Sequence, residues 1–333
     1  MISCQKGYGC AFGGATIINA IASWKGSAFA TELKTYAEVC LNLPFSSKII
    51  QGSVFESPKT DTTLIEYCVE AVFEHFDYMG TASVLTKSAV PTASGLKSSS
   101  AAANAVILAT LDALGETMDP TAIVKLGVAA AKKAGVTITG AYDDACASFF
   151  GGVVLTDNQS LSLLKREEFD YDVLILNPNT KSFSSQTNVS RSILMKDLVD
   201  IAFKAAMDGD YKKAMKLNGI LYCSALGFNP EPAIACMEIG QYFNIAAGLS
   251  GTGPSFAALF PRRQTLTEPD QLILDNVKKT IQTGWLSQFP NARIIETKTC
   301  NRDALSESRL FSDLIKSKNQ PLKEFDLNQF VFL

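Results

Sequence analysis

The chain of 333 residues contains only one histidine, His75. Histidine is the commonest general base and the commonest metal ligand in proteins. Its scarcity therefore excludes most catalytic triads and most metal centres. His75 lies at the edge of the apolar stripe of a helix predicted over residues 62–78, where we expect a structural role.

Several motifs of known chemistry are also missing. The sequence has no Gly-Lys dipeptide, which excludes a Walker A loop, and no G-x-S-x-G segment, which excludes the nucleophile elbow of hydrolases. None of its eight cysteines forms a C-x-x-C pair, so no zinc pattern is present. Because the cysteines are scattered along a long chain, we expect small buried hydrophobes in a reducing compartment rather than a disulfide framework.

The sequence has neither a long apolar run nor an excess of positive charge. The longest apolar stretch, 101–111, ends at Asp112 and is shorter than the ~18 residues of a membrane span. A net charge of -3 gives no field for nonspecific nucleic-acid binding. We therefore expect that the protein binds neither a membrane nor a nucleic acid. We also expect it to be cytoplasmic. The mildly apolar residues 10–22 contain Gly13, Gly14 and Asn19, which disfavours the alternative of a signal peptide.

Length and patterning predict two domains and a mixed architecture. With 47% hydrophobic and 19% charged residues the chain has ample material for a core. We expect domains at 1–160 and 161–333, and an α+β class because strands and helices are segregated rather than alternating. Helices are predicted over 62–78, 98–114, 120–135, 193–207, 210–226, 231–247 and 269–284, and strands over 27–43, 151–156, 171–176, 255–260 and 292–297.

The sharpest local signal is a loop rich in glycine and serine that leads into a buried helix. The free N–H groups and the dipole of a helix start bind anions, and glycine allows close approach of a phosphate. Three consecutive serines exceed what one helix cap needs, and a lysine adds positive charge. The sequence therefore predicts a phosphate site here, formed by Val90, Pro91, Thr92, Ala93, Ser94, Gly95, Leu96, Lys97, Ser98, Ser99 and Ser100.

Three further segments have both a structural and a functional interpretation. In 139–152, Asp143 and Asp144 begin a short helical segment, where they either cap the helix or direct a carboxylate at a substrate hydroxyl. The glycine-rich segment 248–255 either lines a phosphate site or forms a turn. The segment 13–28 combines glycines with Asn19 and Lys25, and its simplest interpretation is a strand and a turn with an exposed lysine.

Taken together, these segments resemble the GHMP kinase superfamily, and most closely its archaeal-type shikimate kinases. The stretches GGATIINAIASWKGSAF, VPTASGLKSSSAAANAVILATLDALG and TGAYDDACASFFGG occur in the order of that family. The resemblance implies an N-terminal ATP-binding domain, a ferredoxin-like C-terminal domain, and ATP-dependent phosphorylation of the shikimate 3-hydroxyl in chorismate and aromatic amino acid biosynthesis. The alternatives are another small-alcohol kinase, such as a homoserine or mevalonate kinase, and a non-catalytic ligand sensor.

The resemblance also implies roles for individual residues. It places Gly95, Leu96 and Ser98 to Ser100 at the ATP phosphates, with Ser99 as a Mg²⁺ ligand; a second, acidic ligand cannot be placed. The catalytic aspartate is Asp144 by its spacing from Ser148, or Asp143 by the preceding Gly-Ala-Tyr. For the shikimate carboxylate the candidate cation is Lys25, with Arg191 and Arg302 as alternatives, and Asn19 is a further substrate-binding candidate. A monomer or homodimer is expected, with shikimate and ATP as partners.

Overall fold

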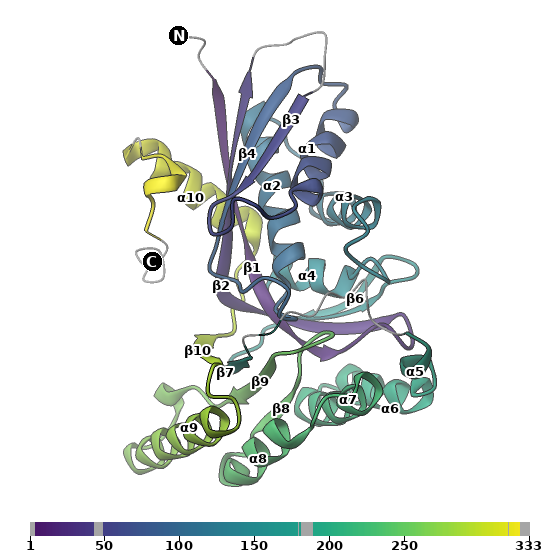
Figure 1. The fold of residues 1–333 in the computed structure, drawn as a ribbon, viewed down its shortest axis with the longest axis vertical. Helices are drawn as coiled ribbons and strands as arrows, with labels where there is room; N and C mark the ends of the chain where they lie inside the picture. The colour runs from purple at the N-terminus through teal and green to yellow at the C-terminus, as the bar shows by residue number, and fades with distance from the viewer. Residues whose placement is uncertain (1–3, 43–48, 179, 181–188, 319, 327–333) are drawn as a thin grey trace.

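Two β-sheets, one above the other along the long axis, organise the chain (Figure 1). The structure is a computed structural model that describes residues 4–42, 49–178, 180, 189–318 and 320–326. The upper sheet has the order β3-β4-β2-β5-β6, with β1 paired to β2, and the lower sheet has the order β10-β7-β9-β8. The strands of the upper sheet are β1 (Gln5–Ile18), β2 (Lys25–Asn42), β3 (Ile49–Val54), β4 (Thr81–Ser88), β5 (Val153–Asp157) and β6 (Ser162–Glu167).

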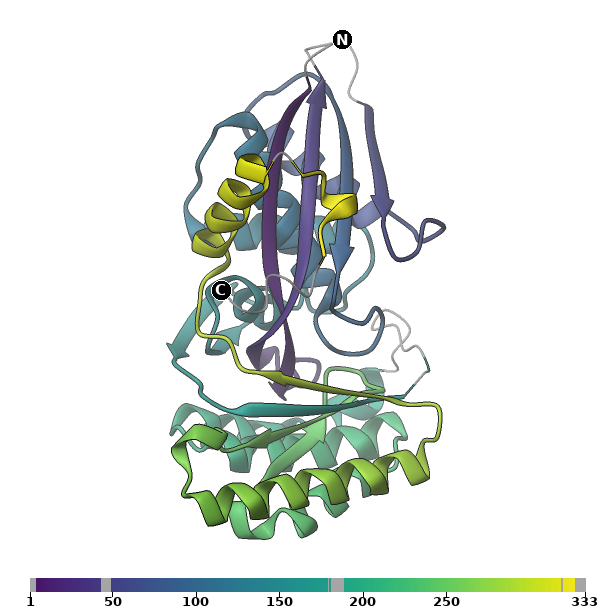
Figure 2. The same ribbon diagram turned by 90° about the vertical axis from the view of Figure 1, so that its left-hand side faces the viewer.

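Helices cover both faces of the upper sheet. The cover on one face consists of α1 (Thr63–His75), α2 (Ser98–Leu114), α3 (Pro120–Lys133) and α4 (Tyr142–Phe150). On the other face α10 (Ala304–Lys318) packs across β1 and β2, where Phe311 contacts Tyr8 and Tyr36 (Figure 2). The last helix thus returns from the lower layer to the upper one.

The lower sheet turns one face to the upper layer and the other to helices (Figure 2). Its strands are β7 (Asp172–Asn177), β8 (Ala246–Leu249), β9 (Phe256–Phe260) and β10 (Arg293–Lys298). The helices of this layer are α5 (Val189–Ile193), α6 (Lys196–Met207), α7 (Tyr211–Leu226), α8 (Glu231–Ile239) and α9 (Glu268–Gln288). Ile17, Ile21 and Phe29, from the end of the β1–β2 hairpin, belong to the same hydrophobic core as Val173 and Leu249. Because this core is shared, the hairpin ties the two layers together.

Local sequence signals explain where the helices of the upper layer begin and end. Helix α2 spans Ser98–Leu114, as predicted, and ends at Gly115, whose φ of +72° is the left-handed conformation that glycine adopts readily. Helix α3 begins at Pro120, and the side chain of Asp119 accepts a hydrogen bond from the N–H of Ala122. The exposed His75 ends α1 and contacts the ring of Phe76 edge to face, so it lies on the surface as a structural residue.

The structure confirms the α+β class and corrects one predicted helix. The helix predicted over 231–247 ends at Ile239, and β8 begins at Ala246. The four residues of β8 are all buried in the lower sheet, and so short an apolar run cannot be assigned to helix or strand by periodicity alone. The division into domains near residue 160 remains a proposal; β6, from beyond that boundary, pairs with β5 in the upper sheet.

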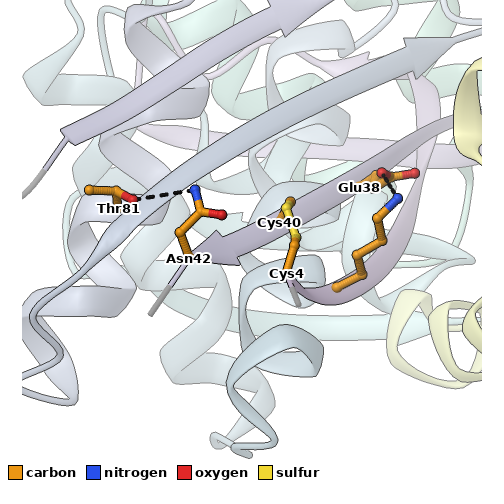
Figure 3. Close-up of a disulfide and its surroundings, with 6 residues drawn as sticks. Cys4, Glu38, Cys40, Asn42 and Thr81 are labelled. Atoms are coloured by element: carbon orange, nitrogen blue, oxygen red, sulfur yellow. Dashed lines mark hydrogen bonds and ion pairs between the residues drawn. A yellow bond between two sulfur atoms is a disulfide. The ribbon is translucent and has the colours of Figure 1, made fainter. Parts of the chain in front are cut away.

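The cysteine prediction was right for six residues and wrong for two. Cys4 and Cys40 are joined by a disulfide that links the start of the chain to β2, with their Cα atoms 5.7 Å apart (Figure 3). The expectation of isolated thiols failed here because the antiparallel pairing of β1 and β2 brings together residues 36 positions apart. The remaining six cysteines are buried free thiols: Cys10, Cys68, Cys146, Cys223, Cys236 and Cys300. Burial raises the pKa of each thiol, which disfavours a nucleophilic role.

Within the described residues, no helix has the length and apolar character needed to cross a membrane.

Helix α2 lies directly on β1 because two residues of that strand have no side chain. An added Cβ at Gly9 would lie 2.3 Å from the carbonyl oxygen of Ala105, and one at Gly7 would lie 2.1 Å from the nitrogen of Ala113. Contacts this short between a side chain and backbone force the elements apart. The spacing between α2 and β1 therefore depends on glycine at these positions.

We predict that Gly9→Ala lowers the free energy of unfolding by about 3 kcal/mol, the upper range for overpacking a core. The matched control is Gly284→Ala in α9, where an added Cβ meets nothing within 4 Å. That variant is expected to gain roughly 0.5–1 kcal/mol, since alanine is the better helix former. Urea unfolding followed by circular dichroism measures both, and equal stability of the two variants would contradict this packing.

Candidate active site

The loop between β4 and α2 is held by backbone contacts with the glycine-rich loop that follows β8. Gly95 has φ +80°, and an added Cβ there would lie 2.1 Å from the carbonyl oxygen of Ser250. The hydroxyl of Ser250 donates to the carbonyl oxygen of Gly95 at 2.8 Å, and the N–H of Ser255 donates to that of Ser94 at 3.3 Å. The two segments singled out in the sequence therefore form one platform.

The serines at the start of α2 do not cap the helix. The residue in the capping position is Lys97, no side chain makes a capping hydrogen bond, and the first helical bond runs from the N–H of Ala101 to the carbonyl oxygen of Lys97 at 3.0 Å. The N–H groups of Ser98, Ser99 and Ser100 precede this ladder and lie at the positive end of a 17-residue helix. Such an end is a ready anion site.

A cavity of about 480 Å³ opens at this helix start. All three serines line it together with Gly95, and its far walls come from α1 and α3, including Leu64 and Val128. The cavity therefore combines anion-binding groups at one end with an apolar wall at the other.

The side chain of Lys97 extends into the protein interior. Its side chain is only 3% exposed, and its ammonium lies 2.6 Å from Oδ1 of Asp144 and donates a hydrogen bond to Oγ1 of Thr16. The same oxygen of Thr16 accepts the N–H of Gly251 at 2.8 Å. One buried ammonium thus links the loop between β4 and α2, here called the phosphate loop after its predicted role, to β1 and α4. Through Thr16 it also links them to the loop after β8.

The backbone of this region is held in conformations that residues with a Cβ rarely adopt. Lys97 has φ +66°, Ala93 has φ +52° and Ala141 has φ +48°. Each such residue costs roughly 1–2 kcal/mol relative to the right-handed conformation, and such strain gathers at functional sites.

Asp143 and Asp144 are neighbours in α4 with different surroundings. Asp144 faces the cavity, and its side chain is 21% exposed. Asp143 is buried against Gly26 and accepts a hydrogen bond from Nδ2 of Asn158 at 2.8 Å. Burial, followed by the charge of Asp144, raises the pKa of Asp143 to about 7. Neither side chain caps α4, so the capping interpretation of the pair does not hold.

The Lys97–Asp144 pair also lines a second, smaller cavity of about 50 Å³. Its lining includes Asn19 and Asp143, and six residues line both cavities: Lys97, Thr137, Ala141, Asp144, Gly251 and Thr252. The pair therefore lines both the cavity of the three serines and the small polar cavity, which is the arrangement that transfer of a group between two bound molecules requires.

The remaining predicted residues differ in their relation to this junction. Asn19 lines the small cavity, but its Nδ2 donates to the carbonyl oxygen of Gly251 and its Oδ1 accepts the N–H of Ile21. Lys25 is exposed and outside both linings, next to the residue that packs on Asp143.

The two alternative cations also lie outside the linings of both cavities. Arg191 is exposed on the short helix α5. Arg302 pairs with Glu32 at 2.6 Å and with Glu307 at 3.3 Å, and it lines a separate cleft of about 1060 Å³. Since two carboxylates already hold its guanidinium, Arg302 is the weakest of the carboxylate-binding candidates.

Sequence reasoning missed two residues of this site. Thr16 lies within the quoted first segment but carries no signal of its own as a threonine in an apolar strand. Asn158, which belongs to none of the motifs singled out in the sequence, holds both the carboxylate and the N–H of Asp143. Nothing in their spacing could have revealed either contact, because both depend on the pairing of distant elements.

The chain matches a known family and has close relatives. Residues 63–152 match the family described as GHMP kinases N terminal domain. A shikimate kinase of Methanosarcina acetivorans is 50% identical over 302 residues, covering 90% of this chain and 96% of the relative. The chain belongs to the shikimate kinases of the GHMP kinase family. A second shikimate kinase, from Methanothrix thermoacetophila, is 52% identical over 310 residues, covering 93% of this chain and 99% of the relative.

Solved structures confirm the GHMP kinase fold for this shikimate kinase family member. A mevalonate kinase of Methanococcus jannaschii aligns with a TM-score of 0.64 at 14% identity, covering 89% of this chain and 98% of the other. A homoserine kinase of Cytophaga hutchinsonii aligns with a TM-score of 0.63 at 14% identity, covering 91% and 98%. At this identity the likeness concerns the fold alone.

The raised pKa of Asp143 predicts a pH-dependent stability. A carboxyl whose pKa rises on folding favours the folded state below its unfolded value near 4, and this contribution is lost as the pH rises to about 7. Asp143→Asn, which has no charge to bury, should therefore gain stability relative to the unsubstituted protein between pH 4 and pH 7 and level off above. Thermal unfolding of both proteins across this range measures the difference, and a difference that is flat or falls with pH would contradict the buried, protonated state.

Proposed function

We propose that this chain transfers the γ-phosphoryl group of ATP to the 3-hydroxyl of shikimate, yielding shikimate 3-phosphate and ADP. The observation that carries the proposal is the Lys97–Asp144 pair at the junction of two cavities, in a chain half identical to shikimate kinases over nine-tenths of its length. This reaction places the chain in aromatic amino acid biosynthesis.

In this proposal ATP occupies the cavity of about 480 Å³ at the start of α2. Its triphosphate binds the N–H groups and hydroxyls of Ser98, Ser99 and Ser100, where the helix dipole and the backbone at Gly95 favour negative charge. The adenosine lies toward the apolar wall formed by α1 and α3. This direction leaves the γ-phosphoryl group at the end of the cavity that adjoins Asp144.

The donor set at this end fits Mg²⁺, which binds oxygen ligands and keeps several waters beside substrate phosphates. The exposed hydroxyl of Ser99 lines the cavity and is our candidate ligand. The described residues contain no group of three or more His, Cys, Asp or Glu that could hold a metal alone, so the nucleotide has to supply ligands as well. The ion would neutralise charge on the transferring group.

Asp144 acts on the acceptor. Its carboxylate accepts a hydrogen bond from the 3-hydroxyl and orients the oxygen for in-line attack on the γ-phosphorus. As the new P–O bond forms, the carboxylate takes the proton, the bond from the γ-phosphorus to the bridging oxygen breaks, and ADP leaves with that oxygen. Asp143 is buried behind it and keeps α4 in position through Asn158. The small cavity of about 50 Å³ does not hold a six-membered ring with a carboxylate, so we expect it to widen when the acceptor binds.

An acceptor panel tests the proposed function directly. With ATP and Mg²⁺, we expect ADP formation to depend on shikimate and not on homoserine or mevalonate, as measured by a coupled assay and by ³¹P NMR of the product. Asp144→Asn should lower kcat by about 10²–10⁴-fold, the usual contribution of a general base. Asp143→Asn is the matched control and should keep most of its turnover. Transfer to homoserine or mevalonate, or full activity of Asp144→Asn, would overturn the proposal.

The candidate cation for the shikimate carboxylate is Lys25. A charge-assisted hydrogen bond contributes roughly 1.5–3 kcal/mol, so Lys25→Met should raise the KM for shikimate about 10- to 100-fold and leave that for ATP nearly unchanged. Lys279→Met, on exposed α9, is the control and should change neither constant. If both KM values rise equally in Lys25→Met, the lysine does not bind the acceptor.

A further inference from the structure

Lys97 occupies a position where the backbone favours glycine. Its φ of +66° is unfavourable for any residue with a Cβ, and glycine would relieve that strain. The lysine stem runs over Gly14, where an added Cβ would lie 3.4 Å from Cγ of Lys97. A strained backbone at a buried cation indicates that the side chain itself is needed.

The ammonium is directed to the acceptor side of the loop. Its side chain is 3% exposed, and its recorded partners are the carboxylate of Asp144 at 2.6 Å and the hydroxyl of Thr16. Thr16 lines the small cavity and does not line the cavity of the three serines. A lysine that serves the phosphates would instead extend its ammonium along the serine face.

We infer that Lys97 is a positioning residue of the reaction, which holds the Asp144 carboxylate at the boundary of the two cavities rather than binding the phosphates of ATP. The inference rests on the proposed function, because Asp144 is the group whose position matters. Thr16 accepts a hydrogen bond from the ammonium and another from the N–H of Gly251. The ammonium is thereby held beside Thr16, and Asp144 is held beside the ammonium.

A buried ion pair of this kind does two things for the reaction. It places a positive charge beside the Asp144 carboxylate at the edge of the small cavity. It also restricts the rotamers of Asp144, and small misplacements of a reacting group lower rates steeply. Removal of the ammonium should therefore lower turnover without weakening nucleotide binding.

The test compares Lys97→Gly, Lys97→Met and Lys97→Arg. In Lys97→Gly the backbone keeps its conformation without strain, so the fold is retained, whereas kcat should fall about 10- to 100-fold. The KM for ATP and the calorimetric Kd of Mg·ATP should stay within about twofold. Lys97→Arg, which keeps the charge, should retain more turnover than Lys97→Met.

Two controls separate positioning from a structural role. Butylammonium, which replaces the missing side chain and its charge, should restore part of the kcat of Lys97→Gly. Added 1-butanol, which lacks the charge, should not restore the kcat of Lys97→Gly, and butylammonium should not restore the kcat of Asp144→Asn. Lys34→Met removes another buried lysine ion pair, the one between Lys34 of β2 and Glu307 of α10. This variant should have a lower melting temperature and an unchanged kcat, because Lys34 lines the separate cleft and neither of the two cavities at Asp144.

Each of the following results would overturn the inference. A rise in the KM and Kd for ATP with unchanged kcat would make Lys97 a phosphate ligand. Unchanged kinetics in Lys97→Gly, or equal rescue by 1-butanol, would make its role structural. If Lys97→Gly does not fold, the comparison of Lys97→Arg with Lys97→Met decides, and equal turnover of these two would also overturn it.

The acceptor panel keeps this test distinct from that of the proposed function. If the unsubstituted protein phosphorylates mevalonate or homoserine, the proposed function fails and the Lys97 variants are compared on that acceptor. If it phosphorylates none, a crystal structure of Lys97→Gly decides: the inference expects the Asp144 carboxylate to leave its place beside Thr16, and an unmoved carboxylate would contradict it.

Discussion

A buried ammonium requires a carboxylate, and the architecture of this site follows from that requirement. Placing a charged amine in the interior is strongly unfavourable unless it is paired and hydrogen-bonded. The ammonium of Lys97 finds both partners at once, Asp144 from α4 and Thr16 from β1. Through them the phosphate loop, the first strand and the acidic helix are fixed relative to one another, and the glycine-rich loop after β8 joins through Gly251.

The fold supports this cluster by tying its two layers together. The β1–β2 hairpin belongs to the upper sheet, while its end lies in the hydrophobic core of the lower layer. The loop after β8 comes from the lower sheet and supports the phosphate loop of the upper one through Ser250 and Gly95. The two cavities therefore meet between elements that neither layer could position by itself.

Local features of the fold could be predicted from the sequence, and contacts between distant segments could not. The bounds of α2 and the start of α3 follow from Gly115 and from Asp119 with Pro120, because caps and turns are decided within a few residues. The phosphate loop was predicted from equally local signals and stays a prediction; the structure shows that its serines are not used as caps. Thr16 and Asn158 were missed because their roles arise only when β1 and β5 lie beside α4. The Cys4–Cys40 disulfide likewise depends on strand register, and β8 was mistaken for the end of a helix because it is short and apolar throughout.

The central claim is that the Lys97–Asp144 pair marks the point of phosphoryl transfer. A crystal structure with Mg²⁺, a non-hydrolysable ATP analogue and shikimate tests it most directly. We predict that the 3-hydroxyl lies within hydrogen-bond distance of the Asp144 carboxylate, that the ammonium of Lys97 stays on Asp144 and Thr16, and that the terminal phosphate lies at the N-terminus of α2 in line with the hydroxyl. A shikimate hydroxyl directed away from Asp144, or a Lys97 ammonium that has left Asp144 for the phosphates, would contradict the account.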